Sequence, residues 1–314
     1  MSLLQVKNLV VEFPGRRGTL RALDDISFEI APGEILGVVG ESGAGKSLTG
    51  ASIIGLLEPP GRVASGQILL QGQRIDNLGH DAMRSIRGRK IGAIFQDPLT
   101  SLNPLYSVGR QLIETIRTHL PVSEQEAKDR AISLLQDTGI PAAAERIDHY
   151  PHQFSGGMRQ RVVIALALAA EPQLIVADEP TTALDVSIQA QIITLLKRIC
   201  KDRGAAVMLI THDMGVIAET CDRVAVMYAG RIAEIGPVHD VINRPAHPYT
   251  EGLMASIPDM TQDRERLNQI DGAMPRLNAI PTGCAFNPRC PRSFDRCTRE
   301  RPELMAAGNN RAAC

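Results

Sequence analysis

The sequence predicts an α/β fold in which apolar strands of a parallel sheet alternate with helices. Three short apolar runs, at residues 35–39, 174–177 and 206–210, carry this prediction. Each run ends at glycine or polar residues, and a segment compatible with a helix follows. This arrangement is typical of buried parallel strands that are joined by helices.

The first eighty residues show a different pattern. Residues 4–13 and 23–30 alternate apolar and polar side chains on either side of a Pro-Gly turn at 14–18, which predicts strand, turn and strand. Residues 66–70 and the turn at Gly72 indicate a further small strand pair.

The middle of the chain changes to helical periodicity. Between residues 107 and 170 apolar side chains recur at helical spacing, and prolines at 121, 141 and 151 interrupt them. We therefore expect a helical insert within the α/β domain, at about residues 99–170.

Length, composition and charge limit the possible functions. A chain of 314 residues with 44% hydrophobic residues can bury the core of one large domain and an extension. Its net charge of -1, from 34 basic and 35 acidic side chains, gives no overall attraction to nucleic acid or anionic lipid. We see no secretion signal, and the apolar run at 162–170 is far shorter than the roughly 20 residues that span a bilayer. We expect a protein that stays in the cytosol and acts at a membrane only through a partner.

Residues 40–47 read Gly-Glu-Ser-Gly-Ala-Gly-Lys-Ser and lie between the first apolar run and a segment compatible with a helix. This spacing is that of a P-loop, in which small residues turn backbone N–H groups toward a polyphosphate at the start of a helix. Lys46 can then reach the β- and γ-phosphates, and Ser47 can bind Mg²⁺. The loop residues that we expect to hold the phosphates are Gly40, Ser42, Gly43, Ala44 and Gly45. An ordinary glycine-rich turn is the alternative.

Polar side chains follow three further apolar runs. Gln96 follows the run at 91–95, Asp178 and Glu179 follow the run at 174–177, and His212 comes just after the third. Because parallel strands present their carboxyl ends at one edge of a sheet, we expect these groups to serve one site. In this reading Asp178 holds Mg²⁺ and Glu179 deprotonates the attacking water. A glutamine or histidine at such a position can also be an ordinary solvated or structural residue.

Three other features remain open on the residues alone. Ser155, Gly156 and Gly157 precede an apolar helical run and can either hold a phosphate or form an ordinary helix cap. Phe13 ends the first strand, where its ring can stack on a base or can simply cover the rim of the sheet. Asp185 opens the helix that follows Glu179.

Taken in order, these motifs resemble the nucleotide-binding subunit of ABC transporters, over about residues 3–255. The resemblance implies a P-loop NTPase of the ABC ATPase type, with a RecA-like core, an antiparallel β subdomain and a helical subdomain. The chain departs from the family at the signature, where the usual Leu-Ser-Gly-Gly-Gln is Phe-Ser-Gly-Gly-Met at 154–158. The serine and both glycines remain.

The resemblance also implies roles for single residues. Phe13 stacks on adenine, Gln96 senses the metal near the coupling helix of a permease, and Glu179 is the general base. Asp185 communicates across a dimer of cassettes, and His212 contacts the γ-phosphate. In the family two ATP molecules are enclosed between the P-loop face of one cassette and the signature of the other.

Two further stretches, 94–104 and 244–250, look like the branch that imports dipeptides, oligopeptides and nickel. That resemblance implies a second ATPase subunit, two transmembrane permeases and an extracytoplasmic peptide-binding protein. It places the chain as a peripheral subunit on the cytoplasmic side of the inner membrane. The dipeptide case is the most similar, and oligopeptide or nickel import are the alternatives.

The last part of the chain contains four cysteines in a C-x5-C-x6-C-x16-C pattern, at Cys284, Cys290, Cys297 and Cys314. Clustered thiols in a cytosolic chain favour a metal over disulfides, although these gaps suit a zinc ribbon poorly. The importer resemblance implies a [4Fe–4S] cluster here, and zinc or an empty thiol tail are the alternatives. We accordingly divide the chain into a nucleotide-binding domain at 1–255 and a small cysteine-rich extension at 256–314.

Two other classes of protein share some of these motifs. A soluble ABC ATPase with a metal-sensing tail would usually contain two cassettes or a long coiled coil, and neither is found in this sequence. A non-catalytic regulatory subunit would not need Lys46, Glu179 and His212, and all three are present.

Overall fold

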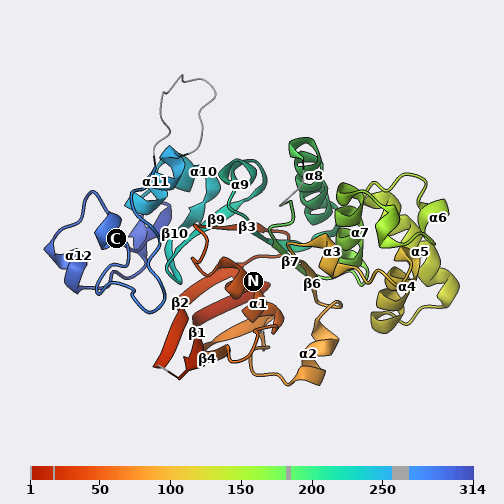
Figure 1. Cartoon of the computed structure of the whole chain (residues 1–314), viewed down its shortest axis with the longest axis horizontal. Helices are drawn as coiled ribbons and strands as arrows, with labels where there is room; N and C mark the ends of the chain where they lie inside the picture. The colour runs from red at the N-terminus through yellow and green to blue at the C-terminus, as the bar shows by residue number, and fades with distance from the viewer. Residues whose placement is uncertain (1, 17, 182–184, 257–268) are drawn as a thin grey trace. The chain divides into compact units, whose positions relative to one another are not determined.

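The computed structural model describes residues 2–16, 18–181, 185–256 and 269–314 (Figure 1). The chain divides into two compact units. The first contains Met1–Ala31, Ile35–Asp76 and Leu209–Cys314, and the second contains Pro32–Glu34 and Asn77–Met208. Strand β8 (Ala206–Ile210) carries the chain from the second unit into the first.

An antiparallel sheet forms the N-terminal part of the first unit, with the strand order β2-β1-β4-β5. Its strands are β1 (Leu4–Gly15), β2 (Gly18–Ile30), β4 (Arg62–Leu70) and β5 (Gln73–Arg74). Both predicted strand pairs are confirmed. Strand β4 begins four residues before the predicted start, because its first residues continue to pair with β1, with Val63 opposite Val11.

The second sheet of the first unit is mixed and not purely parallel. Its strands follow the order β11-β12-β10-β9-β3. They are β3 (Ile35–Val39), β9 (Arg223–Tyr228), β10 (Arg231–Pro237), β11 (Met305–Ala307) and β12 (Asn310–Ala312). Strands β3 and β9 pair in parallel. Strands β9 and β10 pair in antiparallel fashion, because a connection as short as the one between them can join only antiparallel strands.

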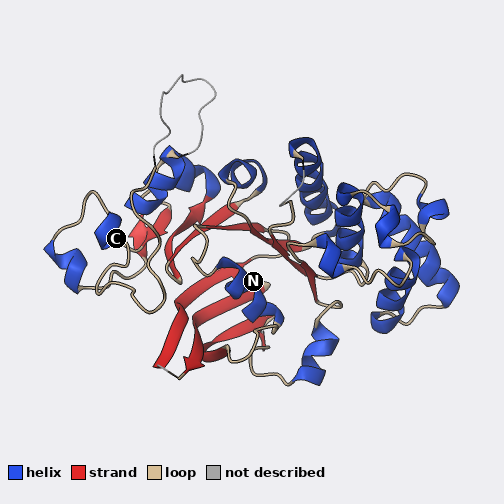
Figure 2. Cartoon of the chain, in the orientation of Figure 1, coloured by secondary structure: helices blue, strands red, loops and turns tan. Residues whose placement is uncertain are grey.

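Helices cover the strands of the first unit (Figure 2). They are α1 (Lys46–Ile54), α9 (Met214–Thr220), α10 (Val238–Asn243), α11 (Pro248–Ala255), the 3₁₀ turn η2 (Asn287–Arg289) and α12 (Asp295–Arg299). Helix α9 packs so closely on β3 that a Cβ atom at Gly37 would lie 2.6 Å from the side chain of Ile217.

The second unit combines two parallel strands with helices. Strands β6 (Ile91–Ile94) and β7 (Leu174–Asp178) are adjacent and parallel. The helices are α2 (His80–Ile86), α3 (Pro98–Ser101), α4 (Val108–His119), α5 (Glu124–Asp137), α6 (Ala143–Arg146), η1 (Pro151–Gln153), α7 (Gly156–Leu168) and α8 (Val186–Arg203). The predicted helical insert is therefore confirmed.

Local signals explain where the helices of the insert begin. Ser107 and Ser123 cap the starts of α4 and α5 by accepting a hydrogen bond from a backbone N–H of the first turn. Ser123 and Glu126 form a reciprocal capping box. The apolar stripe that faces the core includes Leu112 and Leu135, which are both fully buried.

The buried carboxylate of Glu234, on β10, forms hydrogen bonds with segments of the first unit that follow this strand. This side chain is 0% exposed. It accepts hydrogen bonds from the backbone N–H groups of Ala246 at 2.8 Å and His247 at 3.0 Å, and from Nδ2 of Asn310 at 2.8 Å. Strand β12 then pairs with β10 in antiparallel fashion. The last described residues are thus an integral part of the first unit, and the division at 255/256 stays a prediction.

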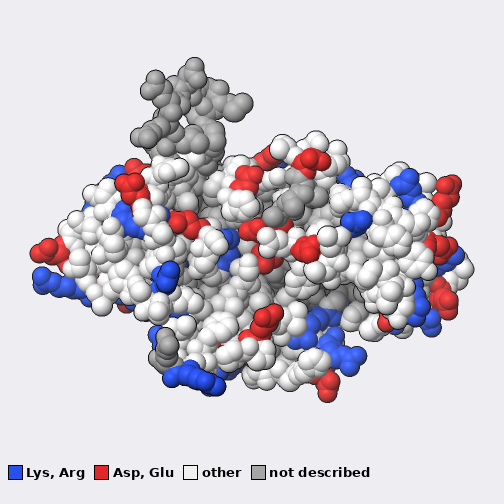
Figure 3. Space-filling model, viewed as in Figure 1, with Lys and Arg blue, Asp and Glu red and all other residues white. Residues whose placement is uncertain are grey.

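None of the helices that the structure describes combines the length and the apolar character needed to cross a membrane. On the face drawn in Figure 3, basic and acidic side chains both occur, in keeping with their nearly equal numbers.

We predict that the first unit loses stability in mild acid because of His247. Burial lowers the pKa of His247 from 6.5 to about 4, and a hydrogen bond to the backbone of Ala313 offsets this only in part. Its Nδ1 atom accepts the N–H of Tyr249 at 3.0 Å at the start of α11, which requires the unprotonated ring. The unfolded chain takes up this proton near pH 6.5, so the free energy of unfolding falls as the pH drops from about 6.5 to 4.

The loss between pH 7 and pH 5 should be about 2 kcal/mol, measured by urea unfolding. The variant His247→Asn keeps a cap of similar kind and cannot titrate, so it should lack this part of the pH dependence. Identical pH profiles for the two proteins would contradict the assignment.

Candidate functional site

The P-loop of the first unit has the geometry that its glycines predict. Strand β3 is buried at all five positions and leads into residues 40–47, and α1 begins at Lys46. Gly40, Gly43 and Gly45 have φ angles of 148°, 84° and 103°, a region that other residues rarely adopt. At Gly40 a Cβ atom would lie 2.3 Å from the carbonyl oxygen of Met227. The loop therefore depends on glycine for both its conformation and its close packing.

The ammonium group of Lys46 lies inside the curve of this loop. The residue is only 7% exposed. Its Nζ atom donates hydrogen bonds to the carbonyl oxygens of Gly40 at 2.8 Å and Glu41 at 3.2 Å. Ser47 follows it in the first turn of α1 and is exposed. A cation held in a loop of glycines at a helix start is suited to bind phosphate oxygens.

Two other predicted residues lie in the first unit. Phe13 pairs with Leu20 across the first hairpin, and its ring packs against Gly61 at the rim of the sheet. His212 is exposed just after β8. The preceding residue, Thr211, donates its N–H to Val38 at 3.2 Å, so His212 lies next to the end of β3, where the P-loop starts. The roles of Phe13 and His212 in nucleotide contact stay predictions.

In the second unit the structure brings Gln96 and Glu179 together. Strands β6 and β7 pair in parallel with Ile94 opposite Ala177, and each of the two polar residues lies two positions beyond that pair. Nε2 of Gln96 donates a hydrogen bond to the Glu179 carboxylate at 3.2 Å. Glu179 has a φ angle of 46°, so the chain turns sharply there. Asp178 is the last residue of β7 and is half-buried.

The signature segment begins α7 in the same unit. Ser155 accepts the N–H of Met158 at 3.4 Å and forms the helix cap, while Phe154 is buried. A Cβ atom on Gly157 would lie 2.9 Å from Ile188 of α8, so the second glycine allows these helices to pack closely. Ser155 and Gly156 are exposed and leave the helix start accessible to an anion.

Met158 occupies the position of the usual signature glutamine. Its Sδ atom accepts a hydrogen bond from Nη1 of Arg146 at 3.6 Å. Asp185 is exposed at the N-cap of α8, where its side chain makes no capping hydrogen bond within that helix. The contacts predicted for Ser155, Gly156, Gly157 and Asp185 with a partner's nucleotide stay predictions.

The structure gives less support to the metal centre predicted at the four C-terminal cysteines. Among the residues that the structure describes, no three His, Cys, Asp or Glu side chains converge in a way that would hold a metal ion. The thiols do interact electrostatically. Burial raises the pKa of Cys284, and the charges of Cys297, Cys314 and Cys290 raise it further. The metal centre stays a prediction. By contrast, Cys200 and Cys221 are buried, as expected for structural thiols.

Sequence reasoning missed one group of residues at the P-loop. Glu41, read only as a variable position of the motif, accepts hydrogen bonds from Arg289 of the C-terminal region. Its backbone N–H is held by Tyr249. Nothing in the local sequence pattern pairs residues that are so far apart in the chain.

A buried strand, a glycine loop that holds a lysine and a helix together define a P-loop nucleotide-binding protein. A family model described as "ABC transporter" matches residues 23–182. A second, described as "Oligopeptide/dipeptide transporter, C-terminal region", matches residues 233–297. The chain belongs to the family of ABC transporter ATP-binding proteins, which confirms the resemblance seen in the sequence.

Similar proteins cover the chain almost completely. The "Dipeptide transport ATP-binding protein DppD" of Escherichia coli (strain K12) is 46% identical over 100% of this chain and 96% of that protein. The protein of the same name from Bacillus subtilis (strain 168) is 49% identical over 95% of this chain and 90% of its own length.

Solved structures agree with the fold. A structure described as "Dimeric structure of a post-hydrolysis state of the ATP-binding cassette MJ0796 bound to ADP and Pi" matches with a TM-score of 0.68 and 29% identity. It covers 75% of this chain and 98% of its own. The cbiO1 protein from Clostridium perfringens matches with a TM-score of 0.67 and 30% identity, over 77% and 91% of the two chains.

We predict that Lys46→Ala weakens ATP binding by about 10- to 100-fold, because hydrogen bonds from a charged donor to phosphate are lost. Titration of the full chain with a fluorescent ATP analogue and Mg²⁺ measures this. Lys7→Ala is the matched control, since Lys7 is exposed on a strand of the same unit. Equal affinities of the Lys46→Ala variant and the unmodified chain would refute the role of the loop.

Proposed function

We propose that this chain is the ATP-hydrolysing subunit of an ABC importer for dipeptides or other short peptides. The observation that carries the proposal is the match to a dipeptide transport ATP-binding protein at 46% identity over the whole chain. The match includes the region after the cassette, where the peptide-transporter model aligns. Oligopeptides and nickel are the alternative substrates.

The residues of the first unit supply the groups that bind the nucleotide. Lys46 binds the β- and γ-phosphates, and the backbone of the glycine loop surrounds them. Phe13 stacks on adenine, and His212 contacts the γ-phosphate. The proposal is supported by the buried position of the Lys46 ammonium and by the location of His212 beside the end of β3.

Mg²⁺ is the metal that the donor set suits. Ser47, Gln96 and Asp178 offer hydroxyl, amide and carboxylate oxygens, which are the ligands that Mg²⁺ prefers. When bound, the ion would neutralise charge on the phosphates.

Glu179 acts as the general base. Its carboxylate accepts the proton of the attacking water, and the hydrogen bond from Gln96 orients the carboxylate for this. Gln96 precedes α3 and is the residue that we propose to lie near the coupling helix of the permease, which would link hydrolysis to the membrane partner.

The assembly contains two ATPase subunits, two permeases and an extracytoplasmic peptide-binding protein. Ser155, Gly156 and Gly157 of one cassette contact the nucleotide of the other, and Asp185 communicates between them. A solved relative is described as a dimer bound to ADP and Pi, which supports this arrangement. The chain then acts as a peripheral subunit at the cytoplasmic side of the inner membrane.

Glu179→Gln should keep ATP binding in the assembled transporter but slow hydrolysis at this site by about 10²- to 10⁴-fold, the usual contribution of a positioned base. Steady-state phosphate release with the permeases in lipid measures this. Glu114→Gln, an exposed position of the same unit, is the control. Unchanged hydrolysis would mean that Glu179 is not the general base. Failure of the chain to co-purify with permeases would favour the alternative of a soluble ABC ATPase.

We also propose that Cys284, Cys290, Cys297 and Cys314 bind a [4Fe–4S] cluster in the C-terminal extension. The backbone N–H of Cys284 donates a hydrogen bond to the carbonyl oxygen of Cys297 at 2.8 Å, which brings these two residues close together and supports the proposal. Four thiolates are the usual ligands of such a cluster. No step of the ATPase reaction is assigned to it.

Anaerobic purification should give about four irons per chain and a broad visible absorption. Cys290→Ser should lose both, whereas Cys221→Ala, a buried thiol outside this set, should retain them. If zinc is found in place of iron, the four cysteines form a structural zinc site and not an iron–sulfur cluster. No metal at all would overturn the proposal.

A further inference from the structure

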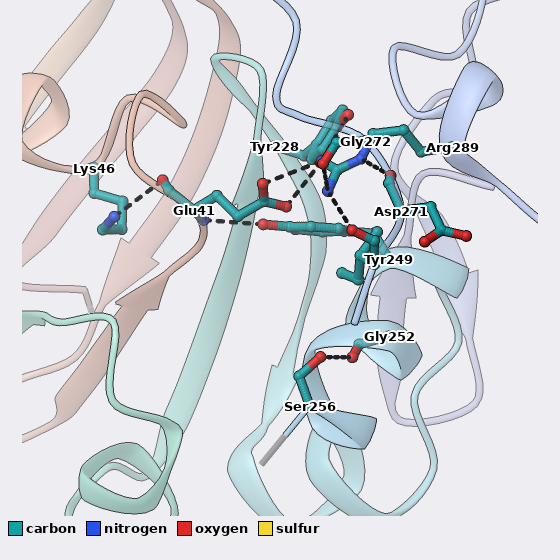
Figure 4. Close-up of polar contacts among 10 residues, drawn as sticks. Glu41, Lys46, Tyr228, Tyr249, Gly252, Ser256, Asp271, Gly272 and Arg289 are labelled. Atoms are coloured by element: carbon teal, nitrogen blue, oxygen red, sulfur yellow. Dashed lines mark hydrogen bonds and ion pairs between the residues drawn. The ribbon is translucent and has the colours of Figure 1, made fainter. Parts of the chain in front are cut away.

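Arg289 of the C-terminal region, residues 269–314, contacts the P-loop (Figure 4). Arg289 lies in the turn η2, and its side chain is only 8% exposed. Its Nη1 atom donates hydrogen bonds to both carboxylate oxygens of Glu41, at 2.9 Å and 3.2 Å. Glu41 is the second residue of the P-loop, so this is an ion pair between the C-terminal region and the nucleotide-binding loop.

The other nitrogens of Arg289 hold the guanidinium in a fixed position. Nε donates to the carbonyl oxygen of Asp271 at 2.8 Å, and Nη2 donates to those of Ile270 at 3.3 Å and Gly272 at 3.4 Å. The side chain is therefore anchored within the C-terminal region and not merely extended across solvent. A bond network of this kind loses little conformational freedom when the ion pair forms.

A buried tyrosine holds the backbone of the same glutamate. The hydroxyl of Tyr249 accepts the N–H of Glu41 at 3.0 Å. Tyr249 is fully buried, and burial raises its pKa, so the hydroxyl stays neutral. Its ring packs against those of Tyr228 and Phe286, with centroids 4.6 Å and 5.4 Å away. Glu41 is thus bound to a rigid aromatic cluster as well as to Arg289.

The backbone carbonyl of Glu41 contacts Lys46, the lysine that we propose to bind phosphate. The carbonyl oxygen accepts a hydrogen bond from Nζ of Lys46 at 3.2 Å. Arg289, Tyr249 and Lys46 therefore each hold a different group of one loop residue. Glu41 thus connects Arg289 to the Lys46 ammonium.

The charge of Glu41 makes this contact matter for the ligand. A carboxylate on a loop that binds a polyphosphate repels the phosphates unless a cation neutralises it. The side chain of Glu41 is 28% exposed, so water screens its charge only in part if the arginine is lost. If the charges of Arg289 and Glu41 are removed together, no unpaired carboxylate remains to repel the phosphates.

We propose that Arg289 is a positioning residue for ATP binding, which neutralises and anchors Glu41 and thereby sets the charge and shape of the P-loop from the C-terminal region. The proposal rests on the proposed function, because it assumes that the loop binds ATP.

The test is the ATP dissociation constant of the full chain at low ionic strength. Arg289→Gln should raise it about tenfold, the effect expected when a charge-assisted hydrogen bond is lost and a carboxylate is left unpaired. Arg292→Gln should not change it. That residue lies three positions further on and forms an exposed ion pair with Glu251, so it matches the change in charge and sequence context.

Two further variants separate the charge effect from loss of structure. Glu41→Gln removes the ion pair that anchors the loop, but it leaves no unpaired carboxylate and keeps the carbonyl contacts of Arg289, so it should raise the dissociation constant only about threefold. The double variant Glu41→Gln with Arg289→Gln should return to the value of Glu41→Gln, because no unpaired charge remains. Added salt should reduce the defect of Arg289→Gln, since it screens the repulsion.

Two results would overturn the proposal. One is a folded Arg289→Gln variant with the affinity of the unmodified chain. The other is a double variant as weak as Arg289→Gln, which would mean that Arg289 serves only the fold of the C-terminal region. If Arg289→Gln does not fold, an unchanged affinity of Glu41→Gln is sufficient to reject it. Absence of ATP binding by the unmodified chain would instead reject the proposed function.

Discussion

Close backbone packing around the P-loop is the constraint on which the first unit depends. Gly40 lies against the carbonyl of Met227, and a Cβ atom at Gly230 would lie 2.3 Å from the carbonyl of Ala22. The N–H of Gly230 also donates to the carbonyl of Ala44 at 2.9 Å. The loop is therefore supported directly by the turn between β9 and β10, and no side chain intervenes. Backbone contacts of this kind hold the shape of the loop, and a preformed site lowers the entropic cost of binding.

Buried charge extends this support toward the end of the chain. Glu234 on β10 binds the backbone before α11 and the side chain of Asn310, while Arg289 binds Glu41 of the P-loop. In both cases one buried side chain makes several hydrogen bonds, which offset the cost of burying it. The neutral residues His247 and Tyr249 contact these two glutamates, Glu234 and Glu41 respectively. His247 stays unprotonated and Tyr249 stays a neutral hydroxyl because both are buried.

The two units hold different groups of the proposed ATPase machinery. The first holds the phosphate-binding loop, and the second holds the Gln96–Glu179 pair and the signature helix. Regular secondary structure positions each group. Parallel register places Gln96 and Glu179 at the same level, and a serine cap defines where the signature helix starts. Gln96 and Glu179 directly follow strands that backbone hydrogen bonds hold in register, which favours a reproducible geometry.

The sequence by itself determined the P-loop, the helical insert and the strand-end pair. Glycine spacing, apolar periodicity and helix caps are local signals, and two parallel strands in register bring Gln96 and Glu179 together without further information. Only the tertiary structure decided the mixed sheet, the pairing of β12 with β10, and the contact between Glu41 and Arg289, which are 248 positions apart. The spacing of the four cysteines likewise did not establish how closely they approach. Contacts of this kind form between segments that are far apart in the chain. Local periodicity does not show which of these segments come together.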